Sequence, residues 1–233
     1  MDTQLALGLV WFLAFLFSTT VHEAMHAFVA WKGGDPTAYH GGQVSLSPIP
    51  HIKREPIGML VVPLLTSLTQ GWAMGWASAP YDPLWAERHP QRAALMAAAG
   101  PAGNFMIALV AFAGLRAGLL TGLFVAPQRA AFHALVADAG TGDPNLLGTV
   151  LSVFLVLNVF IGLFNLLPLP PLDGFSGVSI FLPEEHASKW RALQSNPMMS
   201  MAGLLIAWRV FPAITDPLFS LLLVLVHPGE SYS

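Results

Sequence analysis

The 233-residue chain has no cysteine and carries little charge. Without cysteine, disulfide bonds and thiolate metal sites are excluded, so any metal ion would need histidine, aspartate or glutamate ligands. Charged residues make up 10% of the sequence, whereas they make up roughly a quarter of a soluble domain. Hydrophobic residues make up 55%. This balance predicts a protein that crosses a lipid bilayer several times.

Basic residues are especially scarce near the N-terminus, where none precedes Lys32. The sequence also has no basic stripe with interleaved aromatic residues, so a nucleic-acid partner is not expected. The missing basic residues argue against a cleaved signal peptide, which needs a positively charged n-region. The apolar run over about residues 4–31 is therefore predicted to be a retained transmembrane helix.

Further apolar stretches follow, each close to the roughly 20 residues that span a hydrocarbon core about 30 Å thick. They cover about residues 57–77, 93–120, 146–167 and 198–226. Between the first two stretches, residues 43–47 alternate between polar and apolar side chains, which is typical of a short strand. The sequence predicts a single all-α polytopic membrane domain over 1–233, with its core at about 5–185, a C-terminal helix at about 198–226 and one short β element.

The first apolar stretch contains the motif His22-Glu23-Ala24-Met25-His26. Ionisable side chains are costly inside a membrane and usually mark a functional site. Residues four apart share one face of a helix, so His22 and His26 can bind the same metal ion. Glu23 lies next to them, where it can act as the general base for a water molecule.

A catalytic zinc ion usually has three protein ligands and one open position. The stretch at 146–167 ends in Asn165-Leu-Leu-Pro-Leu-Pro-Pro-Leu-Asp173-Gly174, where three prolines must end the helix near membrane depth. Because irregular backbone is tolerated there only in a protein interior or a wet cavity, Asp173 is a candidate third ligand. Asn165 has two interpretations: it stabilises an oxyanion or holds the substrate backbone, or it satisfies backbone groups that the prolines leave unpaired.

Together these segments resemble the site-2 protease family of intramembrane metalloproteases. The resemblance covers roughly residues 10–185 and includes Gly100-Pro-Ala-Gly-Asn104 in the third apolar stretch. It also includes Gly75-Trp-Ala-Ser-Ala-Pro80, in which Ser78 stands where small prokaryotic members usually have lysine. No inserted PDZ-like domain or C-terminal sensing domain is evident. On its own, the Gly100–Asn104 segment indicates close helix packing with an interhelical hydrogen bond.

The resemblance implies that His22, His26 and Asp173 bind one zinc ion, that Glu23 is the catalytic base and that Asn165 contributes to catalysis. It also implies regulated proteolysis of a membrane-protein substrate with a transmembrane helix. Two other functions remain open: an inactive scaffold of the same fold and a metal-ion carrier. A carrier would need polar residues along a whole crossing route, and a scaffold would not need Glu23.

The metal site also constrains the topology, because His26 and Asp173 must meet at the same leaflet. This requires the stretch at 57–77 to be re-entrant, which leaves four full spans. Most basic residues then lie on one side, which the positive-inside rule places in the cytoplasm. We therefore expect a prokaryotic inner-membrane protein whose active site opens toward the cytoplasm.

Overall fold

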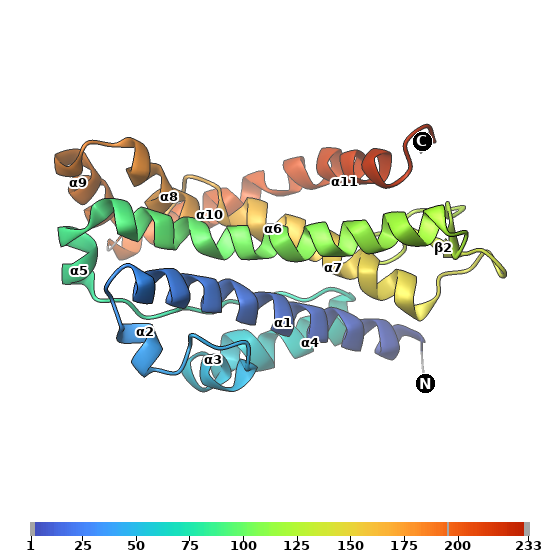
Figure 1. Ribbon diagram of the computed structural model, residues 1–233, viewed down its shortest axis with the longest axis horizontal. Helices are drawn as coiled ribbons and strands as arrows, with labels where there is room; N and C mark the ends of the chain where they lie inside the picture. The colour runs from blue at the N-terminus through green and yellow to red at the C-terminus, as the bar shows by residue number, and fades with distance from the viewer. Residues whose placement is uncertain (1–2, 195, 231–233) are drawn as a thin grey trace.

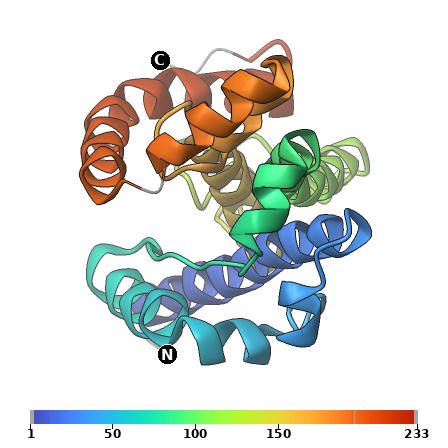
Figure 2. The same cartoon turned by 90° about the vertical axis from the view of Figure 1, so that its left-hand side faces the viewer.

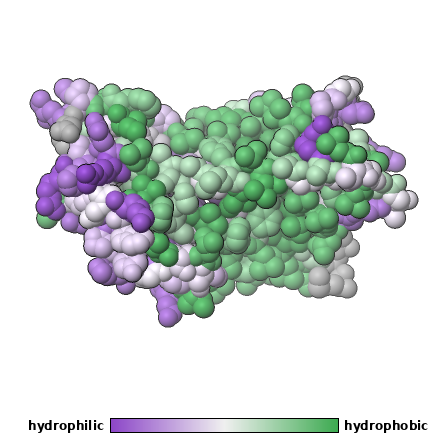
Figure 3. Space-filling view, in the orientation of Figure 1, coloured by the Kyte–Doolittle hydropathy of each residue, from purple (hydrophilic) through white to green (hydrophobic). Residues whose placement is uncertain are grey.

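The computed structural model describes residues 3–194 and 196–230. Its long helices lie side by side along one axis (Figure 1). Three of them, α1 (Thr3–Lys32), α6 (Pro90–Leu120) and α7 (Leu146–Asn165), are long and apolar enough to cross a membrane. On the face seen in Figure 3, hydrophobic residues cover the middle of the molecule and hydrophilic residues gather toward its two ends. The predicted all-α polytopic membrane fold is confirmed.

The two ends of the bundle carry different kinds of structure. Short helices surround the end where α1 finishes and α6 begins (Figures 1 and 2). They are α2 (Thr37–His40), α3 (Pro48–Arg54), α5 (Pro83–Arg88), α8 (Asp173–Gly177), the 3-10 helix η2 (Val178–Phe181) and α9 (Glu184–Gln194). Both chain termini and the connection between α6 and α7 lie at the opposite end. Because both termini lie at the same end, a bundle that spans a membrane in this orientation would cross it an even number of times.

The stretch that the sequence predicts to be re-entrant leaves and returns to the same end of the bundle (Figure 1). It consists of the π-helix η1 (Ile57–Val61), α4 (Val62–Gln70) and an extended segment, 72–82. The chain reverses at Gly71, whose φ of 75° lies in the left-handed region that glycine adopts most easily. The reversal brings the C-terminal ends of α1 and α7 to the same end of the molecule.

The strand expected at 43–47 is not present, and that prediction was wrong. The segment consists of bends, because its polar groups bond to neighbours rather than to a second strand. The Gln43 side chain is buried and donates to the Ser78 carbonyl, and the Ser47 hydroxyl accepts from Ile49 at the start of α3. The described chain instead pairs β1 (Phe124–Val125) with β2 (Ala137–Asp138), antiparallel, at the other end of the bundle.

The expected C-terminal helix at 198–226 is divided into α10 (Pro197–Val210) and α11 (Pro212–Val226), which are bent by 48°. Pro212 lacks the backbone N–H that a continuous helix would need, so the break falls just before it. Taken together, the two helices are long and apolar enough to be a fourth span. α11 packs against α6 and α7 in one apolar cluster that includes Leu115, Val156 and Leu222.

The arrangement predicts that residues 47 and 87 face the same side of the membrane. Both side chains are exposed, and because the chain has no cysteine, Ser47→Cys or Glu87→Cys would introduce its only thiol. An impermeant maleimide is expected to label both variants from one side of sealed vesicles and neither from the other. A cysteine at exposed Thr141, in the connection between α6 and α7, is the opposite-side control. Labelling of positions 47 and 87 from opposite sides would contradict the re-entrant arrangement.

Candidate metal centre

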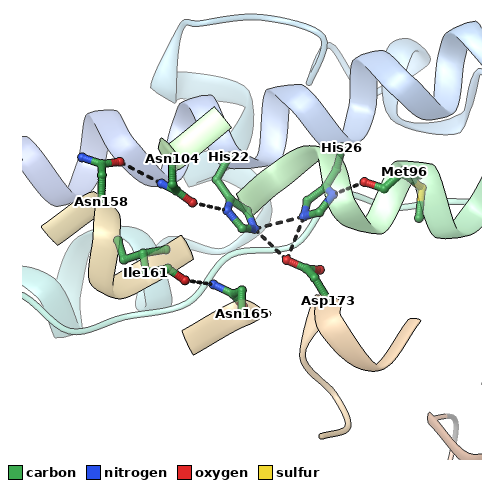
Figure 4. A network of polar contacts seen from close by, with 8 residues as sticks. All are labelled: His22, His26, Met96, Asn104, Asn158, Ile161, Asn165 and Asp173. Carbon is green, nitrogen blue, oxygen red and sulfur yellow. Dashed lines mark hydrogen bonds and ion pairs between the residues drawn. The ribbon is translucent and has the colours of Figure 1, made fainter. Parts of the chain in front are cut away.

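The structure brings together the three residues that the sequence predicts as metal ligands (Figure 4). His22 Nε2 and His26 Nε2 lie 3.0 Å apart on one face of α1. Asp173 Oδ2 lies 3.1 Å from the first nitrogen and 3.3 Å from the second. Both imidazoles are buried. Three potential ligand atoms from two widely separated parts of the sequence therefore lie close together.

The ring orientation of each histidine is fixed by a hydrogen bond from its other nitrogen. His26 Nδ1 lies 2.7 Å from the Met96 carbonyl, and His22 Nδ1 lies 2.6 Å from Asn104 Oδ1. A carbonyl oxygen can only accept, so each Nδ1 must carry the hydrogen. An imidazole that carries its hydrogen on Nδ1 in this way presents Nε2, the atom that faces Asp173, as the metal-binding nitrogen. Such a partner is the usual means of orienting a histidine that binds a metal.

This donor set fits a zinc ion. Two bare imidazole nitrogens and a carboxylate oxygen would repel one another without a cation, and Asp173 Oδ2 has no hydrogen-bond donor among the described residues. Zinc–ligand distances of about 2.0–2.1 Å place tetrahedral ligands about 3.3 Å apart, which is close to the separations seen here. Zinc would thus be held by His22, His26 and Asp173.

The glycines of the Gly100–Asn104 segment permit the close packing of α6 on α1. A Cβ atom at Gly100 would collide with Nε2 of both His22 and His26. A Cβ at Gly103 would instead meet the flexible Met25 side chain at 2.9 Å. The backbone of α6 therefore forms one wall of the metal centre at Gly100, which assigns a specific role to a segment that the sequence indicates only as a helix-packing motif.

Asp173 reaches the centre because the chain leaves α7 through the proline-rich segment 166–172 and starts α8 at Asp173. The turn is tight: a Cβ at Gly174 would collide with the Leu166 carbonyl. Asn165, the last residue of α7, lines the same cavity as Asp173. Its Nδ2 donates to the Ile161 carbonyl at 3.0 Å, within its own helix. This bond uses one of the two N–H groups of the Asn165 amide, and the second forms no hydrogen bond among the described residues.

Glu23 lies beside the two histidines of the candidate metal centre. Its carboxylate can come within 4.8 Å of the ligand atoms of both histidines, and its side chain is buried. It also lines a cavity of about 1210 Å³ that includes His22, His26 and Asp173. Burial lowers the pKa of His133, which also lines this cavity. A water molecule in the cavity can reach both the metal position and the Glu23 carboxylate.

Several residues at the centre are not identifiable from sequence spacing. Asn104 contacts His22 directly, and Asn158 on α7 contacts Asn104 in turn. Asn158 stands within an apolar helix, where a polar residue is a signal of function, but nothing in the sequence indicates its partner. Met96 contributes only a backbone carbonyl, which any residue could supply. These contacts depend on the register of three packed helices.

The sequence of the chain is similar to those of known proteins. Residues 10–209 match peptidase family M50. The chain is 29% identical to "Putative zinc metalloprotease YwhC" of Bacillus subtilis strain 168 over 93% of the chain and 92% of that protein. It is also similar to "Putative zinc metalloprotease Rip2" of Mycolicibacterium smegmatis (29%) and of Mycobacterium tuberculosis H37Rv (28%).

The chain spans 56% and 63% of the lengths of the two Rip2 proteins, whereas it spans nearly the whole of YwhC. No solved structure matches the chain at a significant level. The match to the family covers every residue of the metal centre, from His22 to Asp173. Since that match extends over most of its length, this chain belongs to peptidase family M50, the site-2 protease family.

Proposed function

We propose that the chain is a zinc-dependent endopeptidase that cuts a peptide bond in or near a transmembrane segment of a membrane protein. The observation that carries the proposal is the depth of the metal centre. His22 and His26 lie ten and six residues before the end of α1, or about 15 and 9 Å along its axis. A site at this depth meets the membrane-embedded part of a substrate.

The cavity supports a macromolecular substrate. Its volume of about 1210 Å³ exceeds the roughly 300–1,000 Å³ of small-molecule pockets. Its walls come from α1, from the extended segment 72–82 and from residues of α7, α10 and α11 such as Phe164, Trp208 and Thr215. Apart from the metal centre, the residues that line the cavity are mainly apolar. Such a lining suits the apolar side chains of a transmembrane substrate segment.

The extended segment offers a place for an unwound peptide. The N–H groups of Met74 and Trp76 bond to Thr66 Oγ1 and to the Gly58 carbonyl. The alternate N–H groups of Ala73, Gly75 and Ala77 have no partner within the described part of the chain. These alternate groups form a free edge, which could pair with a substrate by β-augmentation.

The chemistry follows from the positions of the side chains. Zinc, when bound, supplies a Lewis acid that polarises the scissile carbonyl and acidifies a water molecule. Glu23 removes a proton from that water as it attacks the carbonyl carbon, and then delivers the proton to the amine nitrogen as the peptide bond breaks. We expect the second N–H of Asn165 to donate to the substrate. Cleavage at this depth would release the product toward the end of the bundle that carries α3, α5 and α9.

The proposal predicts zinc-dependent cleavage of a single-span substrate in liposomes that contain only the purified chain. Phenanthroline is expected to stop the cleavage and added zinc to restore it, since the described residues contain no second cluster of His, Asp and Glu side chains that could hold a metal ion. Mass spectrometry of the products should place the cut inside or next to the span. Zinc transport into the vesicles without cleavage would indicate a metal carrier instead. Substrate binding without cleavage would indicate an inactive scaffold.

A further inference from the structure

The histidines of the metal centre are held by different kinds of acceptor. His26 donates to a backbone carbonyl, that of Met96, whose polarity cannot change. His22 donates to a side-chain amide, that of Asn104. An amide presents an oxygen on one side and an NH₂ group on the other, so it can support either histidine tautomer depending on how it is turned. Something must therefore fix the orientation of Asn104.

The fixing contact comes from Asn158 on α7 (Figure 4). Asn104 Nδ2 donates to Asn158 Oδ1 at 2.8 Å, and Asn158 Nδ2 donates to the Phe154 carbonyl at 2.8 Å. Since the Phe154 carbonyl only accepts, the NH₂ group of Asn158 must face it and the oxygen must face Asn104. That arrangement turns Asn104 Oδ1 toward His22, so His22 Nδ1 must carry the hydrogen and Nε2 is left bare.

We propose that Asn158 is a positioning residue for the metal centre, acting through Asn104 to fix the tautomer and ring orientation of His22. This inference rests on the proposed zinc site. Asn104 and Asn158 both have 0% exposure, so no water competes for these bonds. The second N–H of Asn158 donates to Ser18 Oγ at 2.9 Å, which ties the relay to α1. A relay of three hydrogen bonds across α1, α6 and α7 thus ends at a metal ligand.

The first test is the zinc affinity of Asn158→Leu, measured by competition with a chromogenic chelator. Loss of an orienting partner of a metal-bound histidine typically costs 10–100-fold in affinity, and we expect a loss in that range. Asn158→Asp is expected to restore most of the affinity, because a protonated carboxyl can donate to the Phe154 carbonyl and accept from Asn104. Ser18→Ala is the matched control: it removes one bond of Asn158 but not the bond that orients it, so zinc affinity should stay within about threefold of the wild type.

The second test asks whether the effect passes through Asn104. Asn104→Leu should weaken zinc binding at least as much as Asn158→Leu, and the double variant should be no worse than Asn104→Leu alone. The absorption spectrum of bound Co²⁺ should change in Asn158→Leu but not in Ser18→Ala. A loss of folding alone would abolish Co²⁺ binding and would not give a bound ion with a changed spectrum. Unchanged zinc affinity in Asn158→Leu, or additive losses in the double variant, would overturn the relay. If the wild type itself binds no zinc, the proposed function fails instead.

Discussion

Replacing Glu23 with glutamine is expected to reduce peptide-bond hydrolysis by about 10²–10⁴-fold, the usual contribution of a general base. Glutamine has nearly the same shape as glutamate but cannot take a proton from water. The ligand set of His22, His26 and Asp173 does not include Glu23, so the zinc content should remain that of the wild type. The measurement is the initial rate of cleavage of the liposome substrate, together with zinc analysis of the same protein.

The matched control is Asp173→Asn. This change is also nearly isosteric, but it removes the charged ligand whose Oδ2 lies 3.1 and 3.3 Å from the two histidine nitrogens. It should lower both the zinc content and the activity. Comparing zinc content and cleavage rate in the two variants therefore distinguishes the role of Glu23 as a base from the role of Asp173 as a ligand. Loss of zinc from Glu23→Gln would make Glu23 a ligand, and a rate above a tenth of the wild-type rate would exclude it as the base.

Replacing Gly100 with alanine is expected to weaken zinc binding by roughly 100-fold or more and to abolish cleavage. The new Cβ would occupy the space in front of both Nε2 atoms. Neither imidazole can turn aside without losing its bond to Asn104 or to the Met96 carbonyl. Overpacking of a rigid site costs about 1–3 kcal/mol, and 3 kcal/mol is about 150-fold in affinity. Zinc affinity is measured by chelator competition on folded protein.

Gly103→Ala provides the control on the same helix, three residues away. Its Cβ would meet Met25 Cγ at 2.9 Å, and a methionine side chain can change rotamer at small cost. This variant should therefore bind zinc like the wild type, although α6 also packs closely on α1 at Gly103. Normal zinc binding by Gly100→Ala would show that the metal position lies elsewhere in the cavity.

Much of the metal centre follows from the sequence because its features are local. The spacing of His22 and His26 places both side chains on one face of any helix, whatever surrounds it. The prolines before Asp173 must end a helix at that point. The re-entrant stretch also follows, since the ends of two helices can share a leaflet only if one apolar stretch between them turns back. Each of these inferences needs only helix geometry and the thickness of a bilayer.

The local reasoning fails where a segment has polar partners elsewhere in the fold. Residues 43–47 alternate like a strand, but the Gln43 side chain bonds to the Ser78 carbonyl across 35 positions of sequence, and no strand lies beside the segment. Alternation describes which side chains could share a face, whereas a strand also needs a partner at the right distance.

The sequence by itself determined the three long apolar helices and the three ligand candidates, because these depend on residue type and spacing along one element. Only the tertiary structure decided that Asn104 faces His22, that Asn158 orients Asn104 and that Gly100 adjoins the metal position. These contacts join α1, α6 and α7, and they exist only at one relative rotation and register of the packed helices. An apolar helix surface does not encode that register in its composition; the interlocking of particular side chains and glycines sets it.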